Sequence, residues 1–430
     1  MMYFEGPKEI PIDDRYDVIV VGSGPSGISA AVMAGRNGAK TLLIENLGSV
    51  GGISTSGLMS HFTGKCDSLL YYEILNRASQ KNYFDNGEAT IKIDPEMLKI
   101  TYMEMLCEAG VELLLYTFAC DVINDGDFVT GIITESKSGR KAYTAKVVID
   151  ASGDGDIASK AGASFILGRE NDNKMQPATL MFKVGGVDPE RAVYLWSFES
   201  KYNTEKGELQ ALAKAKLPEP AGHVLLYPST IPGITTCNMT NVTDIDGTKA
   251  EDLTRAEIIC RKQMLPIVDF LREYVPGYEN CYIISAASLI GIRETRHFKG
   301  IKTITEKDIL EAKEFEDWVV TGAHFNFDVH NITGSGLDKT GAQHKFAQAK
   351  GYTIPYGCLI PEKKEGLLLS GRNISGTHIA HSNFRAMPIC VAIGEACGVA
   401  AAISVKSNCL LRDINVKEIQ KILKKLYYLR

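Results

Sequence analysis

Three side chains that can move protons or hold anions lie within eight residues near the end of the chain. His378, His381 and Arg385 precede a run of small residues, with Asn383 among them. An imidazole exchanges a proton near neutral pH, and a guanidinium grips a carboxylate or phosphate with two hydrogen bonds. We place the three on a loop and expect acid–base or anion-binding chemistry there. The alternative is that this loop only completes a cofactor site.

A second charged set, residues 293–297, reads Arg-Glu-Thr-Arg-His. Alternate residues of an extended segment point to opposite faces, so Arg293 and Thr295 should face one side and Glu294 and Arg296 the other. One arginine can then contact a substrate while the other pairs with an acid, and we take Arg293 as the substrate-side candidate. A purely structural network of ion pairs is the alternative interpretation.

Asp328 and His330 are two positions apart, which places both on one face of a strand. His330 is therefore a candidate acid or base, and an ordinary hydrogen-bonded histidine is the alternative. With His324 the two could approach a metal site, but the ligand set is incomplete. We predict no metal.

The elements that must position these groups begin with a strand, a turn and a helix. Residues 16–22 are a short run rich in Val and Ile, typical of a strand buried in a parallel sheet. The turn that follows has the pattern G-x-G-x-x-G, with Gly22, Gly24 and Gly27. Such a turn lets the backbone approach a pyrophosphate, and the helix N-terminus adds free N–H groups.

Glu45 ends the next strand, 18 residues after Gly27, where a carboxylate can accept both hydroxyls of a ribose. Together the strand, turn, helix and acid predict a dinucleotide site; a glycine-rich turn of an unrelated α/β domain is the alternative. Three further glycine-bearing segments, residues 48–57, 147–156 and 366–373, favour FAD over NAD. They indicate a backbone that follows a longer ligand.

At this point the sequence resembles a known family. The motifs VVGSGPSGISAA, GGISTSG, VVIDASGDGD, GIRETRHFKG, IPYGCLIP and LLLSGRNISGTHIAHSNFRAMPICVAIGEACGVAAA cover most of the chain. They resemble the FAD-dependent oxidoreductases of the glutathione-reductase-like superfamily, and within it a bacterial branch related to fumarate reductase flavoproteins. These motifs are specific for the family and not for a substrate.

The resemblance implies which residues meet the cofactor FAD. The positions are Gly22, Gly24, Gly27, Glu45, Gly52, Val122, Gly153, Asp154, Gly371 and Arg372. Many relatives carry Asp where this chain has Arg372, which either pairs with a phosphate or turns away. Gly394, which we also predict to contact the cofactor, lies on the following helix, whose small residues allow close packing and whose N-terminus could face the flavin. His61 could lie near the flavin edge, but we do not expect a covalent bond to it.

The expected fold class is α/β. A Rossmann-like FAD-binding domain, made of a parallel sheet and a β-meander, should comprise residues 1–163 and 356–430. An inserted α+β substrate or cap domain should comprise residues 164–355. The expected function is hydride transfer between flavin N5 and a small polar or anionic substrate. The alternatives are a flavin monooxygenase and an electron-transfer flavoprotein subunit without its own small-molecule substrate.

The composition of the chain limits the classes of partner and cofactor chemistry that we expect. The net charge of −5 over 430 residues offers no basic excess for nucleic acid, and no run of 18 apolar residues predicts a membrane span. Ten cysteines without a C-x-x-C pair predict reduced thiols in the cytoplasm and no disulfide chemistry. No second G-x-G-x-x-G follows a strand, which argues against a separate NAD(P)H domain. The sequence leaves a homo-oligomer open and does not identify the substrate.

Overall fold

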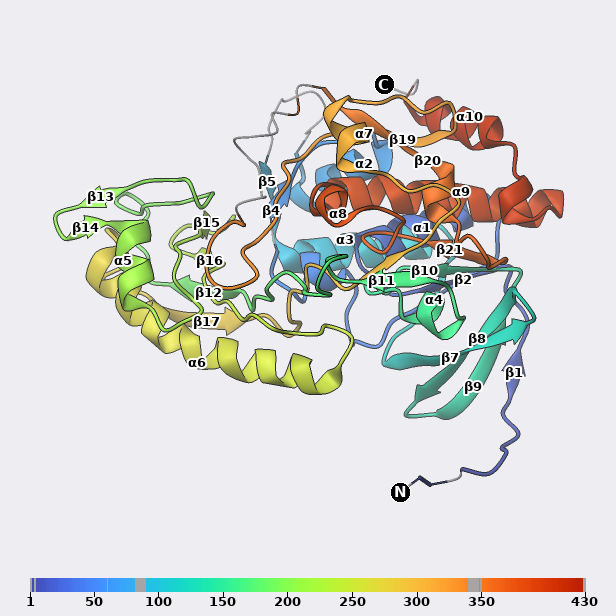
Figure 1. Cartoon of the computed structure of the whole chain (residues 1–430), viewed down its shortest axis with the longest axis horizontal. Helices are drawn as coiled ribbons and strands as arrows, with labels where there is room; N and C mark the ends of the chain where they lie inside the picture. The colour runs from blue at the N-terminus through green and yellow to red at the C-terminus, as the bar shows by residue number, and fades with distance from the viewer. Residues whose placement is uncertain are drawn as a thin grey trace.

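The structure of the chain is a computed structural model, which describes residues 2–3, 5–59, 61–81, 90–338, 348 and 350–427. It forms two lobes (Figure 1). Elements from both ends of the sequence, drawn in blue and red, lie together in one lobe. The middle of the chain, drawn in green and yellow, forms the other.

A five-stranded parallel sheet is the centre of the first lobe. Its spatial order is β21-β10-β2-β3-β6. The strands are β2 (Val18–Val21), β3 (Thr41–Ile44), β6 (Glu112–Leu114), β10 (Val147–Asp150) and β21 (Leu367–Leu369). Every residue of β2, β3, β10 and β21 is buried, which explains their continuous apolar runs.

Helices α1 (Pro25–Arg36) and α9 (Met387–Ser407) pack directly against each other beside this sheet. Their backbones approach so closely that a Cβ at Gly394 would lie 2.0 Å from the carbonyl oxygen of Ser26. Glycine is thus required there because two helices touch. Helices α2 (Leu69–Ser79) and α3 (Pro95–Glu108) also belong to this lobe.

Among the described residues, α9 is one helix whose length and composition would allow it to cross a membrane, with a mean hydropathy of 1.9. This differs from the expectation that no segment is long and apolar enough. However, 89% of the apolar window is buried inside the protein. A helix surrounded by a protein core needs the same apolar residues as one surrounded by lipid, so α9 is explained by its packing.

The second sheet of this lobe is the predicted β-meander, with a short strand added at its edge. Its order is β1-β9-β8-β7, with β1 parallel to β9 and the other pairs antiparallel. The strands are β1 (Ile12–Asp13), β7 (Thr117–Asp125), β8 (Phe128–Ser136) and β9 (Gly139–Thr144).

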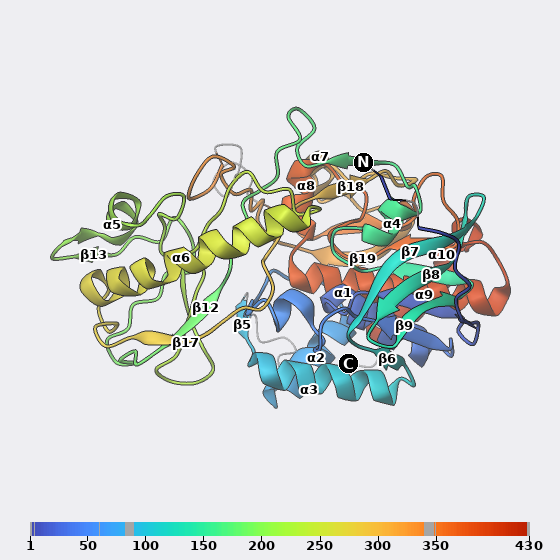
Figure 2. The ribbon, with the colours of Figure 1, turned by 90° about the horizontal axis from the view of Figure 1, so that it is seen from below.

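The second lobe is built on an antiparallel sheet of order β15-β16-β12-β17. Its strands are β12 (Phe182–Gly185), β15 (Leu226–Pro228), β16 (Thr235–Cys237) and β17 (Tyr282–Ala286). The long helix α6 (Ala250–Tyr274) runs along this lobe, as Figure 2 shows. Buried residues of α6 and of the sheet belong to one apolar cluster.

Short elements complete the chain. The paired strands are β4 (His61–Thr63) with β5 (Thr90–Lys92), β11 (Phe165–Leu167) with β18 (Arg296–Phe298), β13 (Asn203–Thr204) with β14 (Gly207–Glu208), and β19 (Trp318–Ala323) with β20 (Tyr352–Pro355). The remaining helices are α4 (Asp156–Lys160), α5 (Leu209–Lys216), α7 (Glu306–Leu310), α8 (His378–Phe384) and α10 (Val416–Tyr427).

Within the described residues, the buried apolar side chains form two separate cores. One contains residues from Tyr16 to Ala163 and from Phe298 to Leu423; the other runs from Ala178 to Ala287. The predicted division, with an insert at 164–355, stays a prediction. By packing alone, β18, α7, β19 and β20 belong with the parallel sheet, although they precede residue 356.

The contact at Gly394 leads to a stability prediction. Gly394→Ala should lower the free energy of unfolding by roughly 1–3 kcal/mol or more, because the new methyl group overlaps the Ser26 carbonyl. Chemical denaturation measures this change. Gly334→Ala is the control, since its Cβ would approach no atom closer than 3.6 Å. Equal stability of the two variants would contradict the close contact.

Candidate active site

A cavity of about 1750 Å³ lies where the two lobes meet, and residues of both line it. A pocket for one drug-sized ligand occupies roughly 300–1,000 Å³, so this cavity has room for a dinucleotide and a second molecule. The lining of this cavity has two parts that differ in chemistry, which we call its cofactor end and its charged end. One is built from the glycine-rich turns, and the other from arginines, a carboxylate and aromatic rings.

The first glycine-rich turn borders the cavity through Gly22, Ser23 and Gly24. A Cβ at Gly24 would meet no atom within 4 Å, so its place is open to a ligand. Gly27 lies behind the turn, where a Cβ would be 1.9 Å from the Gly22 carbonyl oxygen. Gly27 therefore closes the turn by packing, whereas Gly22 and Gly24 face the cavity.

Glu45 borders the same end of the cavity and also fixes the turn. Its Oε2 accepts hydrogen bonds from the Ser23 backbone N–H at 2.9 Å and from Ser23 Oγ at 2.6 Å. Its Oε1 accepts the Leu47 N–H at 2.9 Å. Oε2 uses both of its lone pairs on Ser23, whereas Oε1 keeps one lone pair, so contact with a ribose hydroxyl through Oε1 is compatible with these bonds.

The remaining predicted cofactor positions divide into two groups. Gly52, Gly153, Asp154, Gly371 and Arg372 line the cavity. The guanidinium of Arg372 pairs with another residue of this lining, since its Nη2 lies 2.8 Å from Asp154 Oδ1. The other group, Val122 and Gly394, lies outside the lining. Strand β7 instead meets the cavity at residues 117–119, and Gly394 serves the contact of α9 with α1.

The N-terminus of α9 reaches the cavity, as expected for a helix that follows the last glycine-rich strand. Ala386, Met387 and Cys390 are part of the lining. Pro388 lies in the first turn, where its missing N–H leaves no hydrogen bond unmade. The positive end of the helix dipole therefore lies next to the site.

Arg293 and Arg385 both line the cavity, in the part that we call its charged end. Nη1 of Arg293 donates to the Pro177 carbonyl at 2.6 Å and to Thr179 Oγ1 at 2.9 Å. Burial, together with the charge of Arg385, lowers the pKa of Arg293 to about 10. The group stays charged at neutral pH, so two guanidinium groups share this space.

Asp328 joins the second arginine to His330. Nη2 of Arg385 donates to Asp328 Oδ2 at 2.8 Å, and the same oxygen lies 3.2 Å from His330 Nε2. Burial, followed by the charge of Arg293, lowers the pKa of His330 to about 4. Burial opposes its ionised form, but the pKa of Asp328 is held well below its usual range by His330, which is charged at the acidic pH where Asp328 would titrate, and by the charges of Arg385 and Arg293. With His330 neutral, the two arginines and one carboxylate leave a net charge of about +1.

Aromatic rings line the cavity beside this charged end. The His61 and Tyr227 rings lie 3.9 Å apart between centroids, and Trp196 is 5.5 Å from Tyr227. Phe198 meets His330 edge-on at 5.2 Å. Burial lowers the pKa of His61 to about 4, so it is a neutral part of this wall. Tyr227, Trp196 and Phe198 could not be predicted from the sequence, because isolated aromatic residues carry no motif.

His378 and His381, predicted to face the substrate, lie outside the cavity lining. The segment is not a loop but helix α8, capped by Thr377 through its side chain. The helix turns both imidazoles into the protein, where His378 is 4% and His381 2% exposed. Arg385, at the C-cap, is directed to the cavity. The structure thus separates the three residues that the sequence brings together.

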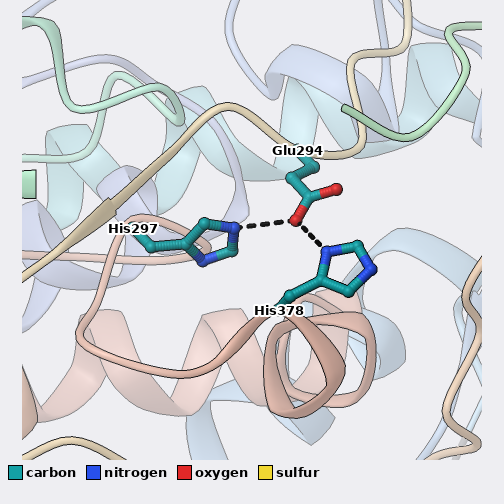
Figure 3. A group of neighbouring side chains, drawn as sticks. All are labelled: Glu294, His297 and His378. Carbon is teal, nitrogen blue, oxygen red and sulfur yellow. Dashed lines mark hydrogen bonds and ion pairs between the residues drawn. The ribbon is translucent and has the colours of Figure 1, made fainter. Parts of the chain in front are cut away.

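The imidazole of His378 forms a hydrogen bond with the buried carboxylate of Glu294 (Figure 3). Its Oε1 lies 2.5 Å from His378 Nδ1 and 2.8 Å from His297 Nε2. These three side chains have the composition of a metal site. Two ligand atoms on one tetrahedral zinc are about 3.3 Å apart, given zinc–nitrogen bonds of about 2.0–2.1 Å. The observed spacings are shorter and match charge-assisted hydrogen bonds.

The neighbouring residues 295 and 296 contact the cofactor end of the cavity. Thr295 Oγ1 donates to Asp154 Oδ1 at 2.7 Å, and Arg296 Nη1 donates to Asp156 Oδ1 at 2.9 Å. Arg296 is thus the acid-paired arginine of the predicted pair, and Arg293 the one nearer the charged end. His324, considered with Asp328 and His330 as a metal ligand, has its Nε2 2.9 Å from the Gln348 carbonyl oxygen.

The comparisons with known proteins agree with this architecture. Residues 17–423 match the family described as FAD dependent oxidoreductase. The chain belongs to this family. Its cofactor is therefore FAD, and the open backbone at Gly24, the turn held by Glu45 and the volume of the cavity fit that dinucleotide.

Two relatives match only in part. Over 164 residues the chain is 28% identical to a digeranylgeranylglycerophospholipid reductase of Methanosarcina acetivorans, covering 35% of this chain and 40% of the relative. Over 152 residues it is 32% identical to a thiamine thiazole synthase of Methanococcus vannielii, covering 32% of this chain and 56% of the relative. The chain therefore spans about half the length of these relatives.

Two solved structures are similar over nearly the whole chain. A geranylgeranyl bacteriochlorophyll reductase-like protein of Thermoplasma acidophilum has a TM-score of 0.52 at 15% identity, covering 97% of this chain and 84% of that one. The p-nitrophenol 4-monooxygenase of Pseudomonas putida has a TM-score of 0.51 at 11% identity, covering 97% and 85%. At such identities the likeness shows the fold.

The bonds of Glu45 allow a test of the cofactor end. Glu45→Ala should weaken FAD binding by about tenfold to a hundredfold, because removing a charged acceptor leaves the Ser23 and Leu47 donors unpaired. Titration of the apoprotein, followed by flavin fluorescence, measures this. Asp121→Ala, on the exposed part of β7, is the control and should bind FAD normally. Unchanged affinity in the Glu45 variant would refute the assignment.

Proposed function

We propose that this flavoenzyme transfers a hydride between FAD and a small substrate that carries a carboxylate or another anionic group. One observation carries the proposal: Arg293 and Arg385 line a single cavity, and the acid bonded to this pair is Asp328, whereas Asp154, Asp156 and Glu257 of the same lining pair with other arginines. An excess of buried positive charge is costly unless an anion joins it, so the site favours an anionic ligand. A place in the branch related to fumarate reductase flavoproteins is part of this proposal.

The division of labour at the site follows from the contacts. FAD, when bound, supplies hydride transfer at its N5 atom. Arg293, anchored by Pro177 and Thr179, is fixed in one direction and orients the anionic group of the substrate. Asp328 holds Arg385 in the same way. Fixed guanidinium groups bind a carboxylate without losing further side-chain freedom.

His330 is suited to move a proton. If Nε2–H donates to Asp328, Nδ1 carries the lone pair that accepts a proton from the substrate. Asp328 then stabilises the imidazolium formed, as a carboxylate does beside a catalytic histidine. The neighbouring ring of Phe198 keeps water away from the imidazole.

The two alternatives need different features. An electron-transfer subunit without its own substrate has no need for two arginines in a buried cavity, so the anion-binding end favours an enzyme with a small-molecule substrate. A flavin monooxygenase would need a binding site for an external reductant. The likeness to p-nitrophenol 4-monooxygenase concerns the fold and does not favour that reaction.

The charge of the site can be tested with a matched pair of probes. Benzoate should bind the holoenzyme and perturb the flavin absorbance, whereas benzamide, of the same shape but uncharged, should bind at least tenfold more weakly. Arg385→Met should remove this preference. The control is Arg191→Gln, an exposed arginine paired with Glu279, which should leave it unchanged. Equal binding of both probes to the wild-type protein would contradict the anionic substrate.

The pKa of His330 gives a pH prediction. Because that pKa is lowered to about 4, His330 is neutral and able to accept a proton above about pH 5. Anaerobic flavin bleaching by a substrate, without NAD(P)H, should slow as the pH falls through 4, and His330→Gln should reduce the rate roughly 10²–10⁴-fold. Imidazole ¹⁵N NMR checks the pKa without a substrate. A His330 that titrates near 6.5 would exclude this role.

A further inference from the structure

Glu294 connects two parts of the chain that each carry one arginine of the cavity. It lies directly after Arg293, on the segment that leads from the second lobe. Its partner His378 is the first residue of α8, and Arg385 is the C-cap of the same short helix. The hydrogen bond from His378 Nδ1 to Glu294 Oε1 thus joins the supports of the two guanidinium groups.

The carboxylate is also tied to the third group of the charged end. Its Oε2 accepts the Gln176 backbone N–H at 3.1 Å. The side-chain Oε1 of Gln176 in turn accepts the backbone N–H of His330 at 3.1 Å. Arg293, Arg385 and His330 are therefore each within a short bonded path of Glu294, although Glu294 itself does not line the cavity.

We propose that Glu294, bonded to His297 and His378, is a proton-dependent latch that sets the relative position of Arg293 and Arg385. In this role Glu294 and His378 are positioning residues, since they act through the arginines. The inference rests on the proposed function in one respect: the anion that the arginines bind is the ligand whose affinity reports the state of the latch.

The charge on His378 strengthens the contact. Burial disfavours the imidazolium, but the hydrogen bond and charge of Glu294 outweigh it and raise the pKa of His378 above its usual value. Burial likewise opposes the Glu294 carboxylate, but its bonds from His297 and His378 hold its pKa well below the usual range. Because the pKa of His378 is raised above its usual value of 6.5, the latch is an ion pair at pH 6.

Other charged groups face this pair. Glu170 accepts the His378 backbone N–H at 3.3 Å. The charge of Glu170 raises the pKa of the His378 imidazole further, while that of nearby Arg169 lowers it. The ring of His381 lies 4.7 Å from that of His297, edge-on. The pKa of His381 is well below its usual value because of burial and the neighbouring His297, so His381 adds no charge near neutral pH.

The direction of the pH effect follows from the raised pKa of His378. The ion pair is present at pH values below that pKa and is lost as the pH rises through it. Neutral His378 can still donate Nδ1–H to Glu294, but the bond then lacks one of its charges. Raising the pH should loosen the latch rather than break it, and the grip of the two arginines on an anion should weaken.

The test uses the holoenzyme with benzoate as the probe, followed by flavin absorbance between pH 6 and pH 9. Benzoate is ionised throughout this range. In the wild-type protein its affinity should fall about tenfold as His378 loses its proton. His378→Asn places an amide N–H near Nδ1 and cannot titrate, so this variant should show no such fall while still binding FAD.

Two further variants separate the latch from a general effect of charge. Glu294→Gln keeps the size of the side chain but removes its charge, and should weaken benzoate binding at pH 6 and abolish the pH dependence. Glu170→Gln removes a carboxylate that faces His378 but does not bond its ring. It should retain the fall in affinity and shift it to lower pH.

Failure of the latch and failure of the proposed function are distinguishable. If benzoate binds but its pH dependence persists in His378→Asn, the latch is overturned. If benzoate binds the wild-type protein at no pH, the anionic substrate is refuted, and ¹⁵N NMR of His378 decides the latch: titration at or below 6.5 would overturn it. One equivalent of metal in the holoprotein, lost in Glu294→Gln, would also overturn it in favour of a metal site.

Discussion

A buried carboxylate has to be met by donors, and this requirement determines how the segments around the cavity are joined. Glu45 accepts the N–H groups of two separate turns, and Asp154 accepts Arg372 and Thr295. Glu294 accepts His378 of α8, and Asp328 accepts Arg385 at the C-cap of that helix. Each acid joins segments far apart in the sequence, because an ionised oxygen left unpaired in such a place would cost several kcal/mol.

The cofactor end could be predicted from the sequence because its signals are local. A strand, a turn and a helix within residues 16–37 specify a phosphate-binding geometry through backbone requirements alone. Gly22 and Gly24 border the cavity for that reason. Val122 was harder to place. Strand β7 meets the cavity at 117–119, just before its register irregularity between Ala119 and Asp121, and not at 122.

The charged end could be predicted only in part. Arg293, Arg385 and His330 are in the cavity lining, but His378 and His381 are not. Whether residues 378–384 form a loop or a helix decides where these imidazoles point, and the N-cap bond of Thr377 makes them a helix. The His378 side chain bonds to Glu294, which lies 84 positions away in the sequence. A long-range pairing of this kind has no periodicity or local spacing that would reveal it.

The segment of residues 293–297 contacts both ends of the cavity, so the positions of the two ends depend on each other. Arg293 reaches the charged end, Glu294 the buried histidines, and Thr295 the loop that carries Asp154. Adjacent residues cannot shift independently, because each is held by a buried or charge-assisted bond. An ordered cofactor loop would therefore help to hold Arg293 in place, and an anion bound to Arg293 would stabilise that loop. Binding of FAD and binding of the substrate should be coupled through these five residues, by the same factor in either direction.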